Sequence, residues 1–300
     1  MTGLPRLIAV VGTNASGKSG LGVELSLRYG GEVISADSRQ VYRGLDLGSG
    51  KITPEEMRGV PHHLLNVCDA GTFFSLADFQ SLAYAAADDI LSRHQLPFLV
   101  GGTGLYVSAV ADGYQLSDVK PDLDYRRELE TLSTPELYAM LRERLPDADA
   151  DPANRNRVMR VLEKLHDGDP GHGEKQPRYQ TLKLGVSWPR DVLCQRIDER
   201  LARRMQAGLV EEVQSLLAAG VSTDFLRRLG LEYRYISAYL LGELPSLDGM
   251  LDELARAIKR FAKRQMTWFR RDADILWLDM TGDPVAQACA AIDRFLADEQ

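Results

Sequence analysis

Short apolar runs alternate with amphipathic segments along the first third of the chain. Residues 7–11 (Leu-Ile-Ala-Val-Val), 32–35 (Glu-Val-Ile-Ser) and 97–100 (Pro-Phe-Leu-Val) have the length of buried strands. Helices are predicted over 19–29 and over 75–94, where apolar side chains recur at helical spacing behind a capping-box pattern. Strands and helices that alternate in this way are typical of a parallel sheet with helices on both faces, whose ligands bind at the carboxyl ends of the strands.

The alternation is interrupted over residues 115–178, where charged helices separated by prolines replace it. Beyond the interruption, further strands and helices are predicted over 181–188, 191–217, 248–270, 275–278 and 284–296. The pattern therefore predicts an α/β fold in two parts. Residues 1–114 and 179–300 form the core with its C-terminal helices, and residues 115–178 form an inserted helical subdomain.

Composition narrows the class of protein. With 44% hydrophobic and 26% charged residues the chain is ordinary for a globular protein, and no apolar stretch approaches membrane-spanning length. The 36 basic and 43 acidic residues argue against nonspecific coating of nucleic acid, but they allow a local basic surface. Three widely spaced cysteines, Cys68, Cys194 and Cys289, favour a reducing compartment without a disulfide framework. We therefore expect a cytoplasmic protein that does not cross a membrane.

A complete phosphate-binding motif follows the first strand. Its residues, Gly12-Thr13-Asn14-Ala15-Ser16-Gly17-Lys18-Ser19, match G-x-x-x-x-G-K-[ST] at every fixed position. With a strand before it and a helix after it, such a loop points backbone N–H groups at phosphate oxygens. Lys18 is expected to reach the terminal phosphates and the Ser19 hydroxyl to bind Mg²⁺. The motif predicts a bound di- or triphosphate, but it does not decide whether the phosphate is transferred, hydrolysed or expelled.

Asp37 follows the strand over 32–35 and is expected at the same edge of the sheet as the loop. A carboxylate there could accept a proton from a nucleophile or orient it, or it could be a turn residue or an indirect partner of Mg²⁺. The strand over 97–100 ends in Gly101-Gly102-Thr103, without the carboxylate that phosphoryl-transfer ATPases usually place there to hold Mg²⁺. That difference weakens an ATPase interpretation.

Arginines recur about once per turn on the helix that follows the strand over 181–188. They are Arg196, Arg200, Arg203 and Arg204. The planar guanidinium group is suited to clamping pyrophosphate. A solvated helix face is the alternative, and for Arg203 and Arg204 we favour it.

The segment 256–271 contains seven Lys or Arg and no acid. Its apolar positions, Phe261 among them, are expected to face the core and to leave a one-sided basic surface suited to an RNA backbone. Trp268 and Phe269 follow helical spacing and are also expected in the core. The pair His62-His63 has no further residue at ligand spacing and is expected to be structural.

Together these segments resemble the tRNA dimethylallyltransferase (tRNA isopentenyltransferase) family over nearly the whole chain. Besides the loop, the resembling segments are 37–48 (DSRQVYRGLDLG), 62–65 (HHLL), 101–106 (GGTGLY) and 264–270 (RQMTWFR). The loop is shared with many families, whereas the first and last of these segments are far more specific. The chain departs from the family at 227–234 (RRLGLEYR), where members often carry Gly-Tyr-Arg, and at Ser19, where many carry Thr.

The resemblance implies a P-loop NTPase-like core that transfers a dimethylallyl group from dimethylallyl pyrophosphate to N6 of the adenine 3′-adjacent to the anticodon in tRNA. It implies that Asp37 holds and deprotonates the adenine amine, while Lys18, Ser19, Mg²⁺ and Arg200 stabilise the departing pyrophosphate. Since nothing is hydrolysed, no ATPase carboxylate is needed. The implied tRNA-binding residues are Asp37, Ser38, Arg39, Gln40, Thr103, Arg126, Asn156, Arg157, Val158, Met159 and Arg160. No membrane contact and no stable protein partner are implied.

Three other functions would share parts of this pattern. A P-loop kinase of a nucleoside or small metabolite would use the same core and require ATP. A relative that prenylates free adenine nucleotide would leave the inserted subdomain and the basic helix without a purpose. A nucleotide-binding RNA adaptor would bind the same ligands without transferring anything. One assay separates these functions: the protein is incubated with labelled dimethylallyl pyrophosphate, Mg²⁺ and either tRNA or AMP, and the molecule that receives the label is identified.

Overall fold

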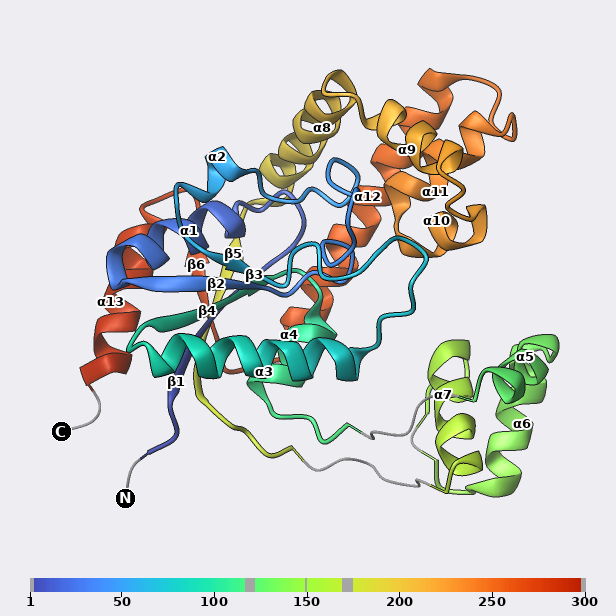
Figure 1. The fold of residues 1–300 in the computed structure, drawn as a ribbon, viewed down its shortest axis with the longest axis horizontal. Coiled ribbons are helices and arrows are strands. Elements are labelled where there is room, and N and C mark those ends of the chain that lie inside the picture. Colours follow the sequence, from blue (N-terminus) through green and yellow to red (C-terminus); the bar gives the residue numbers. More distant parts are fainter. Residues whose placement is uncertain (1–2, 117–121, 149, 169–174, 298–300) are drawn as a thin grey trace. The chain divides into compact units, whose positions relative to one another are not determined.

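The structure, a computed structural model, describes residues 3–116, 122–148, 150–168 and 175–297 and separates into two compact units (Figure 1). The first, here called the core unit, combines Met1–Gly113 with Pro177–Gln300. The second, the inserted unit, is Tyr114–Gln176. Each unit buries apolar side chains of its own.

A six-stranded parallel sheet forms the centre of the core unit, in the order β3-β2-β4-β1-β5-β6. The strands are β1 (Arg6–Val11), β2 (Gly31–Ser35), β3 (His62–His63), β4 (Leu96–Gly101), β5 (Gln180–Ser187) and β6 (Ile275–Asp279). In the register, Val10 of β1 lies between Val100 and Leu184. The predicted parallel sheet is confirmed, and the two-residue edge strand β3 is an addition that apolar periodicity does not reveal.

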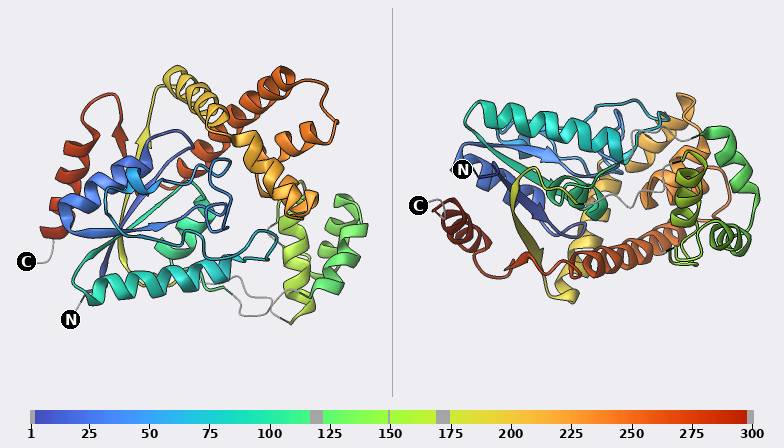
Figure 2. Two further views of the ribbon diagram at one scale, coloured as in Figure 1. Left: turned by 45° about the horizontal axis from the view of Figure 1, so that its top comes forward. Right: turned by 90° about the horizontal axis from the view of Figure 1, so that it is seen from below.

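Helices cover both faces of the sheet, as the alternating pattern predicts (Figure 2). On one face Leu7 and Ala9 of β1 pack with α3 (Leu76–Ser92) and α4 (Gly104–Ala111). On the other face Ile8 packs with α1 (Lys18–Tyr29) and α13 (Pro284–Ala297). Successive residues of a strand point to opposite faces, so β1 is buried on both sides and anchors the loop that follows it. A short helix, α2 (Pro54–Met57), lies between β2 and β3 in sequence.

The remaining helices of the core unit follow β5. They are α8 (Arg190–Gln206), α9 (Leu209–Ala218), α10 (Thr223–Leu229), α11 (Leu231–Leu240) and α12 (Leu247–Phe269). The prediction of one helix over 191–217 is wrong, because the chain turns between α8 and α9 at Gly208. There φ is +99°, a left-handed conformation that glycine adopts without steric cost. The turn lets Leu209 and Val213 join Tyr233 and Leu254 in a separate apolar cluster.

Three helices make up the described part of the inserted unit: α5 (Leu123–Thr131), α6 (Thr134–Arg144) and α7 (Arg155–His166). A capping box between Ser133 and Glu136 starts α6. The helices enclose a small core that includes Leu137, Val158 and Leu162.

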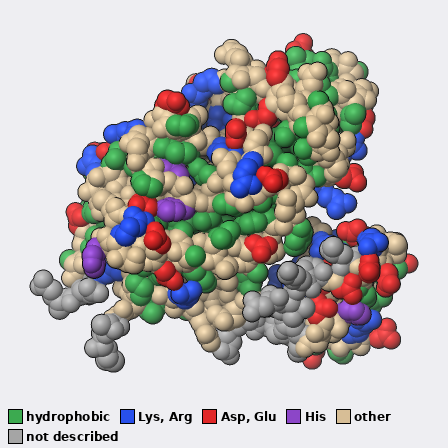
Figure 3. Space-filling model, in the orientation of Figure 1, with side chains coloured by type: hydrophobic (Ala, Val, Ile, Leu, Met, Phe, Trp, Pro, Cys, Tyr) green, Lys and Arg blue, Asp and Glu red, His purple; other side chains and the backbone are tan. Residues whose placement is uncertain are grey.

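Two features of the exterior bear on the class of protein. In the described residues, no helix combines the length and the apolar character that a membrane span requires. On the face shown in Figure 3, basic and acidic side chains lie interspersed. On this face, the part of the chain that the structure describes shows no extended surface of one charge.

Candidate functional site

The phosphate-binding loop connects β1 to α1 and has the backbone shape that its glycines require. A Cβ at Gly12 would lie 2.5 Å from Val186 Cγ2 of β5, so only glycine fits there. Gly17 has φ +87° and is the N-cap of α1, where it has no side chain to occupy the first amides of the helix. Lys18 Nζ donates to the carbonyl oxygen of Thr13 at 3.2 Å, and Ser16 Oγ donates to the same oxygen at 2.7 Å. The loop is thus built to present N–H groups and a lysine to an anion.

Side chains distant in sequence fix this loop. Gln265 of α12 accepts a hydrogen bond from the Asn14 backbone N–H at 2.9 Å and donates to the Gly102 carbonyl at the end of β4 at 2.8 Å. Trp188 Nε1 donates to the Ser16 carbonyl at 2.8 Å, and Arg196 Nε donates to the Ala15 carbonyl at 3.0 Å. These hydrogen bonds hold the loop in a defined shape.

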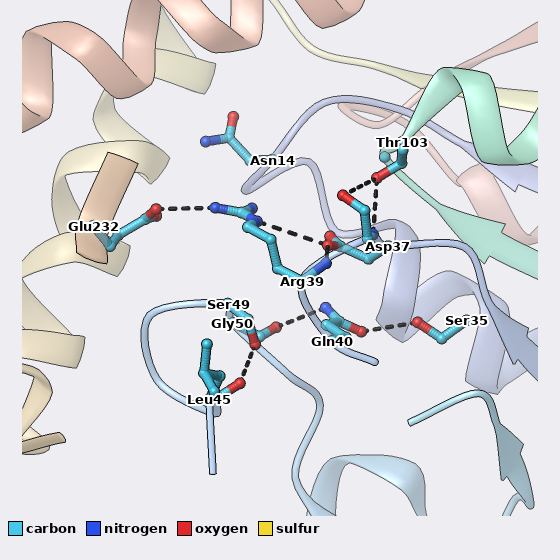
Figure 4. A network of polar contacts seen from close by, with 12 residues as sticks. Asn14, Ser35, Asp37, Arg39, Gln40, Leu45, Ser49, Gly50, Thr103 and Glu232 are labelled. Atoms are coloured by element: carbon cyan, nitrogen blue, oxygen red, sulfur yellow. Dashed lines mark hydrogen bonds and ion pairs between the residues drawn. The ribbon is translucent and has the colours of Figure 1, made fainter. Parts of the chain in front are cut away.

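Asp37 lies directly after β2, and local hydrogen bonds orient it (Figure 4). Its Oδ1 accepts from the Arg39 backbone N–H at 3.0 Å, and Arg39 Nε lies 3.7 Å from the same oxygen. The Ser38 N–H donates to Thr103 Oγ1 at 3.1 Å, which joins this segment to the residue that follows β4. The carboxylate is 14% exposed, and these contacts hold it at the edge of the sheet.

Asp37 and the loop open onto one cavity of about 290 Å³. Most of its wall comes from segments that follow strands and from α12: Asn14, Asp37, Ser38, Arg39, Thr103, Ile258, Phe261, Arg264 and Gln265. Residues 228–232 and 234, at the junction of α10 and α11, complete the wall. Asn14 Oδ1 is a buried oxygen without a hydrogen-bond partner in the described structure, as expected where a ligand's donor group belongs.

Four basic side chains gather beside Asp37: Lys18, Arg39, Arg200 and Arg204. Burial lowers the pKa of Lys18 to about 8, with Asp37 acting against the shift and Arg200 adding to it. Burial and the neighbouring Arg204 lower the pKa of Arg200 to about 9. Crowded, partly desolvated cations of this kind gain stability when an anion binds among them. We call these four residues the cation cluster.

The expectation that Arg204 is a solvated residue is wrong. Its side chain is 14% exposed, and its Nη1 donates to Glu232 Oε1 at 3.3 Å. Arg203, next to it, is exposed as expected. Spacing along α8 cannot distinguish the two, because the partner of Arg204 lies on α11.

The loop at residues 45–50 supplies a carbonyl to the cation cluster. Arg200 Nη2 donates to the Gly50 carbonyl at 3.1 Å, and Gln40 Nε2 donates to the same oxygen at 3.3 Å. Ser35 Oγ in turn donates to Gln40 Oε1 at 2.9 Å (Figure 4). Glu212 of α9 fixes the loop by accepting from the backbone N–H groups of residues 46, 47 and 48. Glu212 has no sequence signal that we recognise in advance.

Comparison with known proteins decides the family. The model described as IPP transferase matches residues 40–272, and the model described as isopentenyl transferase matches residues 5–69. A tRNA dimethylallyltransferase 2 from Syntrophotalea carbinolica is 45% identical over 93% of this chain and 96% of its own length. This chain belongs to the IPP transferase family.

Solved structures agree with the IPP transferase assignment. The tRNA isopentenylpyrophosphate transferase from Bacillus halodurans is 40% identical, with a TM-score of 0.74 over 98% of this chain and 96% of that one. A eukaryotic dimethylallyltransferase acting on tRNA has a TM-score of 0.82 over 99% of this chain and 80% of its own, at 22% identity. These likenesses confirm the P-loop NTPase-like α/β fold, and the family does not favour the kinase alternative.

On α12, several basic and aromatic residues lie differently from the expectation. Lys259 is not unpaired, because its Nζ lies 2.6 Å from Asp198 of α8. Phe261 is only partly buried and faces the cavity, with the Arg264 guanidinium 5.5 Å from its ring centre. Trp268 is 43% exposed, whereas Phe269 is buried as expected. The basic surface predicted for this helix therefore falls on its exposed residues, Arg256, Arg260, Lys263, Arg264, Arg270 and Arg271.

The histidine pair is structural, as expected. His63 Nε2 lies 2.6 Å from Glu32 Oε2, and His62 Nδ1 lies 2.8 Å from the Val60 carbonyl oxygen. Within the described residues, no group of three or more His, Cys, Asp or Glu could hold a metal ion.

In the inserted unit, the candidate tRNA-binding residues differ in their exposure and surroundings. Asn156 and Arg157 are exposed. Arg126 and Arg160 each donate to one carboxylate oxygen of the buried Glu163 at 3.0 Å. The other two candidates, Val158 and Met159, have their side chains in the core of this unit.

Proposed function

We propose that this chain transfers a dimethylallyl group from dimethylallyl pyrophosphate to N6 of the adenine 3′-adjacent to the anticodon in tRNA and releases pyrophosphate. Relatives named tRNA dimethylallyltransferase are similar to this chain over nearly their full length. The observation that carries the proposal at the level of chemistry is the cavity, which brings the Asp37 carboxylate and Asn14 of the phosphate-binding loop to one space. A base for the amine and a site for the leaving group are then adjacent. Because the proposed substrate is tRNA, we also propose that the protein acts in the cytoplasm.

On the acceptor side, Asp37 is the proposed general base. The adenine N6 attacks the first carbon of the dimethylallyl group, the bond from that carbon to the pyrophosphate oxygen breaks, and the N6 proton passes to the Asp37 carboxylate. Arg39 and Thr103 support this role through the hydrogen bonds that orient residues 37 and 38. The adenine must leave its stack to reach Asp37, which suits recognition of an RNA loop.

On the donor side, the phosphate-binding loop, Lys18 and Arg200 are the proposed pyrophosphate ligands. They stabilise the negative charge that the leaving group acquires as the carbon–oxygen bond breaks. Carbonyl oxygens of Thr13 and Gly50 hold the two cations without neutralising them. Burial lowers the pKa of both side chains, so a bound anion would favour their charged forms.

We also propose that Mg²⁺ accompanies the donor, with the Ser19 hydroxyl as its protein ligand. The donor set fits this ion, because Mg²⁺ at phosphate sites is usually held by phosphate oxygens, water and one or two protein oxygens. The absence of a cluster of acidic or histidine ligands in the described part of the chain is compatible with such a site. When bound, the ion would neutralise part of the pyrophosphate charge.

Transfer of label tests the proposal. The protein is incubated with dimethylallyl pyrophosphate labelled in the dimethylallyl group, with Mg²⁺ and with either tRNA or AMP. We expect label in tRNA and none in AMP. Label in AMP alone would favour a nucleotide prenyltransferase. Transfer of phosphate from ATP to a nucleoside, without label in tRNA, would favour the kinase alternative. Binding of both substrates without any transfer would favour an RNA adaptor.

A further inference from the structure

Glu232, in the first turn of α11, joins two members of the cation cluster, Arg39 and Arg204. Figure 4 shows the contact with Arg39. Its Oε2 accepts from Arg39 Nη1 at 3.0 Å, and its Oε1 accepts from Arg204 Nη1 at 3.3 Å. The carboxylate is only 4% exposed, so water screens these contacts little. The N-terminal turn of a helix also favours a negative side chain. Glu232 therefore links α8 to the segment that carries Asp37.

Arg204 competes for space and charge with Arg200. Gly50 has φ +66°, and a Cβ there would overlap the terminal nitrogens of both guanidinium groups. Two guanidinium groups that meet at one backbone position repel each other, and Glu232 offsets that repulsion on the Arg204 side. The four cations of the cluster face two carboxylates, Asp37 and Glu232, which leaves an excess of positive charge for a polyanion.

We propose that Glu232 is a positioning residue that competes with pyrophosphate for Arg204 and so weakens the hold of the donor site on its leaving group. The inference rests on the proposed function, because it concerns the release of that reaction's product. Glu232 holds Arg204 through the 3.3 Å hydrogen bond. When pyrophosphate is present, Arg204 turns toward it, and when pyrophosphate leaves, Glu232 takes Arg204 back. Pyrophosphate is highly charged, and a carboxylate that competes for one of its cationic ligands would speed its release.

Glu232 comes from a part of the chain where the sequence departs from the pattern common in the family, residues 227–234. The same segment makes room for Arg39, since a Cβ at Gly230 would lie only 3.0 Å from Arg39 Cδ. Arg39 thus passes Gly230 to reach Glu232 and keeps its Nε 3.7 Å from Asp37. The segment 227–234 therefore supplies both Glu232 and the space through which Arg39 reaches it.

Equilibrium binding of pyrophosphate with Mg²⁺, measured by calorimetry on the purified full chain, tests the proposal. In Glu232→Gln we expect the dissociation constant to fall about tenfold, because one buried negative charge that competes for Arg204 is gone. The matched control is Glu199→Gln, which makes the same charge change on an exposed residue of α8 and should leave the constant unchanged. An unchanged or raised constant in Glu232→Gln overturns the proposal and leaves Glu232 as a scaffold of the two arginines.

Arg204 variants show whether Glu232 acts through that residue. In an Arg204→Gln background, Glu232→Gln should no longer tighten binding, and persistent tightening would contradict the pathway. Should Glu232→Gln fail to fold, Arg204→Gln and Arg200→Gln still decide the question. Arg204→Gln should lose less affinity than Arg200→Gln, since Arg204 must give up Glu232 on binding, and equal losses overturn the proposal. A wild-type protein that binds no pyrophosphate at all would instead overturn the donor site itself.

Discussion

Lys18 and Arg200, the proposed pyrophosphate ligands, are each oriented by a backbone carbonyl oxygen. Each donates to a backbone carbonyl oxygen, of Thr13 at 3.2 Å and of Gly50 at 3.1 Å. A carbonyl orients a cation but leaves its charge in place. Burial and neighbouring arginines lower the pKa of Lys18 and of Arg200, and a bound anion would favour the charged form of both.

Removing either cation should impair the donor site alone. In Lys18→Ala and Arg200→Ala we expect kcat/KM for dimethylallyl pyrophosphate to fall by about a hundredfold or more, the usual effect of losing one group that stabilises developing charge. Affinity for tRNA, measured by filter binding, should stay nearly intact. Arg203→Ala, on the exposed face of α8, is the control and should behave as wild type. Collapse of tRNA binding with normal donor kinetics would contradict this division of the site.

Glu32 makes a pH-dependent contribution to stability. Hydrogen bonds from Arg93 and then from His63 outweigh burial and lower its pKa to about 2, below its ordinary 4.5. A carboxylate with a lowered pKa stabilises the fold above pH 4.5, and that contribution is lost as the pH falls toward 2. In urea unfolding, Glu32→Gln should therefore lower the free energy of unfolding at pH 7, and this loss should become smaller as the pH falls from 4.5 toward 2.

A matched control for Glu32 is Glu24→Gln. Glu24 also pairs with two arginines, Arg28 and Arg58, but it is more exposed. Its loss should cost little at any pH, because water screens the pairs. A penalty for Glu32→Gln that does not change with pH would show that the lost side chain matters through packing rather than charge.

Among elements, apolar periodicity predicts those whose pattern is long or continuous. β1, β4 and α3 lie where the sequence places them, since continuous or regularly spaced apolar residues leave few alternative structures. β3 has only two residues and forms through pairing with β2, which no local pattern announces. A glycine inside a periodic helix is often tolerated, so Gly208 alone does not predict a break. The break depends on tertiary packing, which lets Leu209 and Val213 join a separate apolar cluster.

The break between α8 and α9 leads to a stability prediction. At φ +99°, Gly208→Ala should lower the free energy of unfolding by about 1–2 kcal/mol, the cost of a left-handed conformation for a residue with a Cβ. Gly20→Ala is the control, since Gly20 lies in α1 with open space around its Cβ and should be neutral or slightly stabilising. Urea denaturation measures both. Equal effects of the two changes would contradict a conformational requirement at Gly208.

The candidate site was predictable only in part, for a similar reason. The loop and Asp37 follow strands, so strand prediction brings them to one edge of the sheet. Arg204 was misjudged because its partner Glu232 is 28 residues away, on another helix. Phe261 keeps the spacing of a core residue, yet this part of α12 lines a cavity. Spacing identifies a face of a helix but not what that face meets.

At the scale of the whole molecule, each of the two units carries basic side chains that are candidates for tRNA binding. In the core unit the exposed cations of α12 include Arg260, Lys263 and Arg264. In the inserted unit Arg157 is exposed, and Arg126 and Arg160 neutralise Glu163. We propose that both surfaces bind the RNA backbone, and their shares can be separated by salt.

Salt dependence apportions tRNA affinity between the units. Each lost phosphate contact should reduce the slope of log affinity against log salt by about 0.7–0.9. We expect Arg260→Gln/Lys263→Gln/Arg264→Gln to flatten the slope by about two. The matched variant of the inserted unit changes Arg126, Arg157, Arg160 and Glu163 to Gln together, so that no buried carboxylate loses its partners. A wild-type slope in the first variant with a flattened slope in the second would place tRNA binding mainly on the inserted unit.

The most direct test of the central claim follows the dimethylallyl group into a defined nucleoside. Wild-type protein and Asp37→Ala are incubated with tRNA, labelled dimethylallyl pyrophosphate and Mg²⁺, and the tRNA is digested and analysed by mass spectrometry. We predict label on N6 of the adenine 3′-adjacent to the anticodon, formed at least about a hundredfold more slowly by Asp37→Ala, as for loss of a general base. The KM for the donor should change little. Label at another position, or an undiminished rate in Asp37→Ala, would contradict the account.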